Sequence, residues 1–150
     1  MNEFVRSDYE DVYSIKCSNL NSIVDILKVF FSYTPKFVKI LMEVRNILVS
    51  SLGIKSVRPN KYIVSSKIKA GSSIGLFEIV SLTSNSAVIG IDDSHLNFRI
   101  ILTTQESVIT CKTQVEFNNR LGRMYFFFIK PFHKFIVPSM LKSLKRHLNE

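Results

Sequence analysis

Three side chains that could take part in chemistry lie two residues apart in one short run: His95, Asn97 and Arg99. If this run is a β-strand, all three share one face, because side chains along a strand alternate between its two faces. A histidine and an arginine on one face could bind an anionic head group, or the histidine could act as an acid or a base. The alternative is structural: His95 and Arg99 would satisfy loop carbonyls or pair with the neighbouring Asp92 or Asp93.

A second group of candidates lies near the C-terminus. His133 stands beside Lys130 and Lys134 in a Pro-Phe-His run, which either shapes a bend in a helix or presents a histidine for catalysis. Arg120 and Arg123 come earlier in the same segment, at the end of a helix where the macrodipole does not favour a cation. They therefore either pair with carboxylates or mark a site for an anion. The candidate carboxylates are Glu116, Asp92 and Asp93.

The run Tyr125–Phe128 carries too many aromatic side chains for one face of a helix. Part of it is expected to face the core, and the rest a cavity, a partner or a lipid. Ligand cavities are mostly apolar with a few polar groups, and the chain offers both kinds of residue. The candidate ligand-binding residues are His95, Phe98, Arg99, Arg123, Tyr125, Phe128, Phe132 and His133.

Strong catalytic signatures are missing from the sequence. The chain has no glycine-rich phosphate loop, no Gly-x-Ser-x-Gly elbow and no Cys/His cluster with zinc-ligand spacing. We therefore expect no metal and no cofactor, assign no catalytic residue, and leave open whether the protein is an enzyme.

The elements that must position these residues follow from hydrophobic periodicity. Residues 9–17 alternate weakly between apolar and polar positions and predict a first strand. Residues 20–31 place apolar side chains at i, i+3, i+4 and i+7, which predicts an amphipathic helix capped by Ser18 or Asn19.

A second helix is predicted to begin at Thr34-Pro35 and to stop at Gly53. Residues 55–73 then read as a connecting segment, with a possible short strand at 62–64. The buried stripe expected on the second helix consists of Phe37, Ile40, Leu41, Val44 and Leu48.

An antiparallel meander is predicted for the next part of the chain, because apolar and polar residues alternate there between turn-forming residues. Its four strands are expected at residues 74–82, 87–92, 95–103 and 108–117.

A long C-terminal helix is predicted from Asn119 onward. Its prolines, Pro131 and Pro138, each remove one backbone hydrogen bond and should kink or break it. Arg123, Lys130 and other basic residues are expected on its wet side. The residues expected on its buried face are Leu121, Met124, Phe128, Phe132 and Phe135, extended by Ile136, Met140 and Leu144.

Length and composition place the chain among globular proteins. Its 150 residues fit one domain spanning residues 1–150, and 46% are hydrophobic and 21% charged, which excludes a disordered chain. The formal net charge is +8, and residues 118–150 carry seven cations against one acid, so a basic surface near the C-terminus is expected to attract anions.

Cellular location is inferred from what the sequence lacks. We see no signal peptide, and the longest apolar stretch, Met124–Leu141, is interrupted by charges and two prolines, unlike a membrane-spanning helix. A cytoplasmic protein is therefore expected, with the thiols of Cys17 and Cys111 reduced.

Two motifs and the opening strand resemble an uncharacterised bacterial family known only as a domain of unknown function, number 2867. The motifs are Asn119–Tyr125 followed by Ile129–Val137, and Asp93–Ile100; the strand carries Asp8, Tyr9 and Asp11. The resemblance implies an α+β helix-grip fold of the START-like (SRPBCC) superfamily. In that fold a curved antiparallel sheet wraps around a long C-terminal helix, and the cavity between them holds an apolar ligand. Asn97 departs from the pattern, which usually has an acid there. The resemblance implies a fold and no reaction.

Three functions follow from these observations. The first is binding of a small hydrophobic ligand (a lipid, a quinone or a polyketide-like molecule) between the sheet and the C-terminal helix. The second is a cyclase-like or hydrolase-like enzyme in the same cavity, which would need His95, Arg99 and Tyr125 to converge. The third is peripheral binding to an anionic membrane through the basic helix. Nucleic acid is the least favoured partner, because no motif that reads it is present.

Overall fold

The structure of the protein is a computed structural model, in which residues 7–18, 21–51, 68–74 and 77–149 are described. The predicted order of strand, two helices, antiparallel strands and long helix is confirmed. The elements are β1 (Tyr9–Lys16), α1 (Ile23–Ser32), α2 (Lys36–Ser51), β2 (Ser73–Ile74), β3 (Phe77–Leu82), β4 (Ser86–Asp92), β5 (Leu96–Gln105), β6 (Val108–Phe117) and α3 (Arg120–Leu148).

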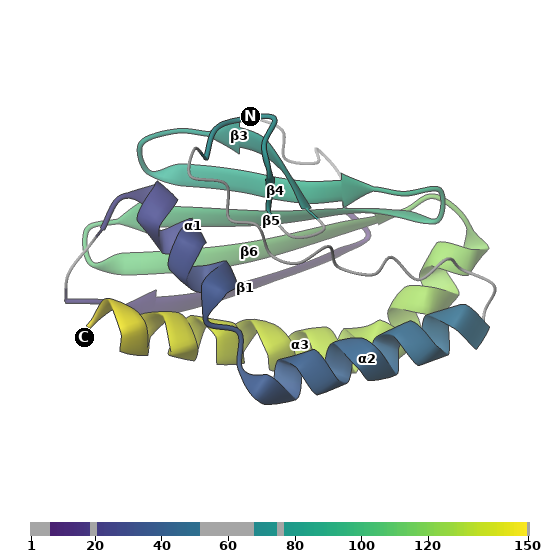
Figure 1. Ribbon diagram of the computed structural model, residues 1–150. Coiled ribbons are helices and arrows are strands. Elements are labelled where there is room, and N and C mark those ends of the chain that lie inside the picture. Colours follow the sequence, from purple (N-terminus) through teal and green to yellow (C-terminus); the bar gives the residue numbers. More distant parts are fainter. Residues whose placement is uncertain (1–6, 19–20, 52–67, 75–76, 150) are drawn as a thin grey trace.

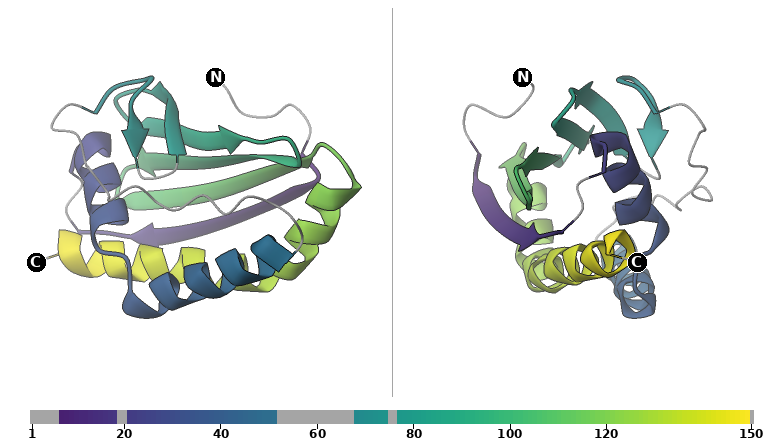
Figure 2. Two further views of the ribbon diagram at one scale, coloured as in Figure 1. Left: turned by 45° about the vertical axis from the view of Figure 1, so that its right-hand side comes forward. Right: turned by 90° about the vertical axis from the view of Figure 1, so that its left-hand side faces the viewer.

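The strands form one antiparallel sheet in the order β1-β6-β5-β4-β3-β2. β1 comes first in the chain but pairs with the last strand, β6, so the two helices that follow it must cross the sheet. The sheet is curved, and α1 and α3 lie on its concave side (Figures 1 and 2). The protein is therefore an α+β structure in which a curved sheet holds a long C-terminal helix.

The predicted strands agree with the structure except at one place. The single strand expected at residues 74–82 is divided into β2 and β3, and the pairing of β3 with β4 shifts between Ile79 and Ser81. The alternation that predicted β5 is confirmed, since Ile100 and Leu102 lie on the inner face with Phe98.

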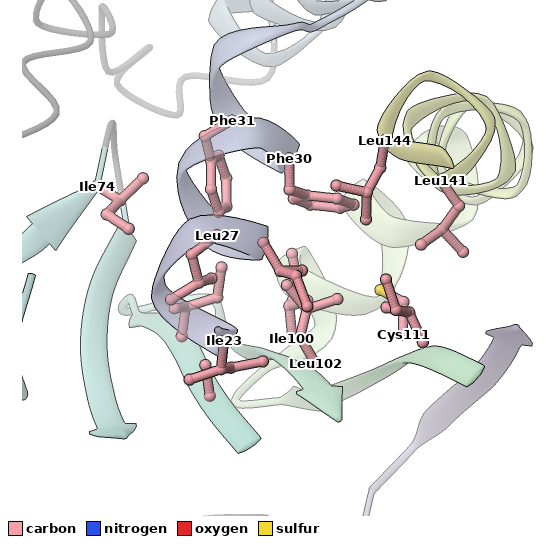
Figure 3. Packing of buried hydrophobic residues seen from close by; sticks show 14 of the residues in the cluster. Ile23, Leu27, Phe30, Phe31, Ile74, Ile100, Leu102, Cys111, Leu141 and Leu144 are labelled. Atoms are coloured by element: carbon pink, nitrogen blue, oxygen red, sulfur yellow. The ribbon is translucent and has the colours of Figure 1, made fainter. Parts of the chain in front are cut away.

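The main core lies between α1, the second half of α3 and the inner face of the sheet. In Figure 3, Phe30 and Leu144 point toward each other over Leu102 and Cys111 of the sheet. Burying a leucine or phenylalanine side chain of this size stabilises a fold by about 1.5–3 kcal/mol, so these contacts fix both helices on the sheet.

Helix α1 begins three residues later than predicted. Ser22 is its N-cap: the Ser22 Oγ accepts a hydrogen bond from the Asp25 amide and donates one to the Asp25 carboxylate. Of the two caps predicted instead, Ser18 precedes the helix and Asn19 lies outside the described residues.

The predicted buried face of α3 is correct at Met140 and Leu144 but wrong at four positions nearer the start of the helix. Leu121, Met124, Phe128 and Phe135 are exposed, whereas the side toward the sheet carries Gly122, Phe126, His133, Val137, Leu141 and Leu144. The cause is a contact made by the first turn. Gly122 lies so close to the His95 carbonyl that an added Cβ would overlap it, and this contact turns the Leu121 side of the helix outward.

Helix α3 continues through both prolines. Pro131 and Pro138 lie inside one helix that bends along its course, with its first turns leading away from the end of β6 and the rest running below the sheet (Figure 2). Of the two expected outcomes, a bend rather than a break is observed.

Helix α2 lies beside α3 (Figures 1 and 2). Its predicted buried stripe is wrong at Ile40 and Val44, which are exposed together with Ile47 on the same side of the helix. The amphipathic pattern predicts an apolar stripe but not the element that packs against it. Among the described elements, none covers Ile40, Val44 or Ile47. The side chains of Phe37, Leu41 and Leu48 lie outside the described part of the chain, as do Gly53 and the short strand predicted at residues 62–64.

Candidate functional site

Hydrogen bonds join the turn between β4 and β5 to the start of α3. Asn119 caps the helix by accepting a hydrogen bond from the Gly122 amide at 2.9 Å, and its own amide group donates to the Ser94 carbonyl at 3.2 Å. Asn118 donates to the Asp93 carbonyl at 2.7 Å. The motif around residues 93–100 and the motif that begins at Asn119 thus meet at one end of the sheet.

His95 is part of this contact between the β4–β5 turn and α3. It precedes β5, it is buried, and its ring packs edge-on against Tyr125 with the centroids 5.0 Å apart. Its Nδ1 lies 3.3 Å from the carboxylate of Asp93. These contacts match the structural interpretation of His95, in which the histidine pairs with a neighbouring acid.

Arg99 lies on the other face of the sheet. Its Nη1 donates to Asp92 at 2.7 Å and to the Phe98 carbonyl at 2.9 Å, and its side chain occupies the space that a Cβ on Gly90 would need. Asn97, also on that face, exchanges hydrogen bonds with Asn118. His95, Arg99 and Tyr125 therefore do not converge on one point.

A polar cluster lies on the concave face, between β1 and α3. One oxygen of Asp11, Oδ2, accepts a hydrogen bond from the Tyr9 hydroxyl at 2.7 Å and lies 3.1 Å from His133 Nε2. The side chains of Asp11 and His133 are only 12% and 10% exposed. The rings of Phe98 and Tyr9 approach the His133 ring edge-on, at 5.9 and 6.2 Å. The cluster thus combines a buried carboxylate and a histidine with aromatic walls.

The environment of Asp11 changes the pKa values of several neighbours. Burial alone would raise the pKa of Asp11, but the contacts from His133, Tyr9 and Thr113 outweigh it, so this pKa lies below its usual value. Burial, together with the negative charge of Asp11, raises the pKa of Tyr9 and that of Tyr13 and brings the pKa of Cys111 to about 12. Such groupings of shifted pKa values occur often at functional sites.

Three buried polar atoms in the cluster make no hydrogen bond of good geometry: Asp11 Oδ1, Thr113 Oγ1 and His133 Nε2. Thr113 stands directly opposite Asp11 in the β1–β6 pairing. Two of these atoms nevertheless have a polar neighbour, since His133 Nε2 lies 3.1 Å from Asp11 Oδ2 and the Thr113 hydroxyl helps to lower the pKa of Asp11. The cluster is thus incompletely hydrogen-bonded, which is uncommon for buried polar groups. Chemically, the arrangement can hold a hydroxyl or amino group or exchange a proton with it.

A second site lies on the outer surface at the start of α3. It is an open hollow of about 820 Å³ lined by Asp8, Phe117, Asn118, Asn119, Arg120, Arg123, Met124, Phe127 and Phe128. The Arg123 guanidinium lies 5.9 Å from the centre of the Phe117 ring. Neither arginine forms an ion pair with a carboxylate among the described residues, so the pairing predicted for Arg120 and Arg123 is not observed there.

Seven of the eight predicted ligand-binding residues are thus divided among four places. Phe98 and His133 belong to the concave cluster, and His95 and Tyr125 to the contact between the β4–β5 turn and α3. Arg99 lies on the outer face of the sheet, and Arg123 and Phe128 line the hollow. Phe132 is half-buried on α3.

Sequence reasoning did not select Asp11 or Thr113 as site residues. One signal was available: Asp11 occupies an inward position of the first strand, between Tyr9 and Tyr13, where an apolar residue is expected.

The fold and the cluster define an α+β protein with a curved antiparallel sheet and a polar group enclosed beneath its C-terminal helix. The chain belongs to the family described as "Protein of unknown function (DUF2867)", whose model matches residues 4–140. No curated protein and no solved structure gave a match to the chain. Among the described helices, none is long and apolar enough to cross a membrane.

Proposed function

We propose that the protein binds a small hydrophobic molecule with a polar end, such as a lipid, a quinone or a polyketide-like compound, between the sheet and α3. The Asp11–His133 pair receives the polar end. We also propose that the architecture is the helix-grip fold of the START-like (SRPBCC) superfamily, which the position of α3 along the concave side of the sheet supports.

The observation that carries the proposal is the incomplete hydrogen bonding of the buried group formed by Asp11, His133 and Thr113. Leaving a buried donor or acceptor unsatisfied costs about 1–3 kcal/mol, and a ligand that supplies the missing hydrogen bonds removes this penalty. Because the low pKa of Asp11 keeps its carboxylate ionised near neutral pH, the preferred ligand carries a hydrogen-bond donor, such as a hydroxyl or an amino group. The half-buried rings of Tyr13, Phe77 and Phe98 line the same face and suit its apolar part.

Access to the site requires movement. Asp11 Oδ1, Thr113 Oγ1 and His133 Nε2 are closed to solvent, so a ligand reaches them only when the contact between β1 and α3 opens. A cytoplasmic location is part of the proposal, and the free cysteines Cys17 and Cys111 are consistent with a reducing compartment.

The test is to extract the purified protein with organic solvent and to identify retained molecules by mass spectrometry. We expect the wild type to retain a specific amphiphile and Asp11→Asn to retain at least about tenfold less of it, since two of the unsatisfied atoms belong to the Asp11–His133 pair. The matched control is Glu10→Gln, which removes the neighbouring carboxylate on the opposite face of β1. No retained molecule in the wild type, or equal retention in both variants, would refute the proposal.

A second candidate function is an enzyme of the cyclase or hydrolase type that uses the same site. The contact between His133 and Asp11 favours it, because a carboxylate beside a histidine orients the ring for proton transfer. If the extracted molecule is converted by the wild type but bound unchanged by His133→Asn, the protein is an enzyme. If both proteins bind it unchanged, the site only binds.

A further inference from the structure

The outer face of α3 presents an apolar surface that the core does not use. It consists of Leu121, Met124, Phe127, Phe128 and Phe135, and Phe127, Phe128 and Phe135 are 73%, 47% and 64% exposed. At about 100° per residue, the four residues other than Phe127 fall within about 60° of one another. Met124, Phe127 and Phe128 line one hollow together, and exposed apolar side chains that gather in this way mark an interaction site more often than scattered ones do.

Cations accompany this apolar surface. Arg120, Arg123 and Lys134 are exposed on the same stretch of helix, and residues 118–149 contain no acid. Lys130 lies instead against β1, with its Nζ 5.2 Å from the centre of the Tyr9 ring. Arg120 and Arg123 border the hollow, where Met124, Phe127 and Phe128 provide an apolar wall. The carboxylate of Asp8 in the same hollow accepts a hydrogen bond from the Phe117 amide. The partner that fits must therefore offer negative charge and an apolar interior side by side.

An anionic lipid bilayer meets both requirements. Amphipathic helices with aromatic residues and flanking Lys/Arg bind in the plane of the interface, where the apolar side chains enter the acyl boundary and the cations contact lipid phosphates. A second copy of the chain, bound through the same face, would place Arg120 and Arg123 against the same cations, so charge disfavours it. Nucleic acid would use the cations and rings but would leave Leu121 and Met124 exposed.

We propose that the outer face of α3 docks the protein on an anionic membrane surface, with Phe127 and Phe128 entering the interface and Arg120 and Arg123 contacting lipid phosphate. The docking is peripheral and does not depend on the ligand site on the concave face.

The first experiment uses intrinsic fluorescence, because the chain contains no tryptophan. Phe128→Trp places a single reporter on the outer face, and Val12→Trp places a matched reporter at another exposed apolar position, on the outer face of β1. With vesicles of phosphatidylcholine and phosphatidylglycerol (70:30), the emission of Phe128→Trp should shift to the blue and that of Val12→Trp should not. Equal shifts, or none, would overturn the proposal.

The second experiment measures vesicle co-sedimentation of the full chain. Binding should be at least about tenfold stronger to the anionic vesicles than to pure phosphatidylcholine and should weaken in 500 mM salt. Phe127→Ser/Phe128→Ser and Arg120→Glu/Arg123→Glu should each lower binding about tenfold. The controls are Val12→Ser, which removes one exposed apolar side chain from another surface, and Lys16→Glu/Lys69→Glu, which makes the same change of charge elsewhere.

Circular dichroism and thermal unfolding establish that each variant is folded. If Lys16→Glu/Lys69→Glu weakens binding as much as Arg120→Glu/Arg123→Glu, net charge alone is responsible and the docking surface is refuted. A dimer that dissociates in Phe127→Ser/Phe128→Ser, with no vesicle binding by the wild type, would assign the outer face to a second copy of the chain and would also refute it.

Discussion

Thr113 places a hydroxyl group on the inner face of β6, where its neighbours Cys111 and Val115 are apolar and fully buried. Its Oγ1 makes no hydrogen bond of good geometry, and it stands opposite Asp11. A residue chosen for stability alone would be apolar here. The hydroxyl group is therefore incompletely hydrogen-bonded beside Asp11, at the point where the proposed ligand would use it.

We predict that Thr113→Val leaves the free energy of unfolding unchanged or raises it by up to about 1 kcal/mol, because it removes an unsatisfied buried group while keeping the shape. Urea unfolding measures the change. Thr110→Val on the other face of β6 is the control, since the Thr110 hydroxyl bonds to Ser14 at 3.0 Å and should give a small loss. A loss above about 1 kcal/mol in Thr113→Val would mean that its hydroxyl has a partner.

Asp11 should make stability depend on pH in a defined direction. Its folded-state pKa is lowered, so the unfolded chain takes up the proton first as the pH falls, and the contribution of Asp11 is present above about pH 4 and lost below it. Asp11→Asn should therefore be about 1–3 kcal/mol less stable than the wild type at pH 7. The difference should shrink toward pH 3 in urea titrations at both values. A constant difference would contradict the assigned pKa direction.

At the scale of elements, α3 is oriented by its first turn. Gly122 packs on the His95 carbonyl, Asn119 caps the helix, and Tyr125 covers the His95 ring. His95 lies in one of the two motifs that resemble the family, and Gly122 lies in the other. The direct effect of both motifs is therefore on the position of the helix on the sheet.

We predict that Gly122→Ala destabilises the protein by about 1–3 kcal/mol, because the added methyl group overlaps the His95 carbonyl. Helix propensity alone predicts the opposite sign, since alanine is about 1 kcal/mol better than glycine in a helix. Lys142→Ala, at an exposed position of α3, should change stability by less than about 0.5 kcal/mol. A more stable Gly122→Ala would show that helix and turn can separate without cost.

At the scale of the whole molecule, α3 has two apolar sides with different roles. One side closes the core with α1, and the other remains exposed beside the cations. We predict that Leu144→Ala costs about 2–5 kcal/mol of stability, whereas Leu121→Ala costs less than about 0.5 kcal/mol. Chemical denaturation of both variants measures this, and an equal loss would contradict the orientation of the helix.

Much of the architecture was determined by the sequence itself. The bounds of β6, the inner face of β5 and the order of elements were predictable, because the alternation of a strand repeats every two residues and a turn is marked by local residue types. The cations near the C-terminus and the candidate residue His133 were visible in the same way.

Only the tertiary structure decided which side of α3 is buried and what His133 contacts. The helix carries apolar residues on two sides, so periodicity alone could not choose between them; the contact of Gly122 with the His95 carbonyl made the choice. The Asp11–His133 pair joins the first strand to the last helix. Its two residues lie far apart in the sequence, and no local pattern records that folding brings them within 3.1 Å.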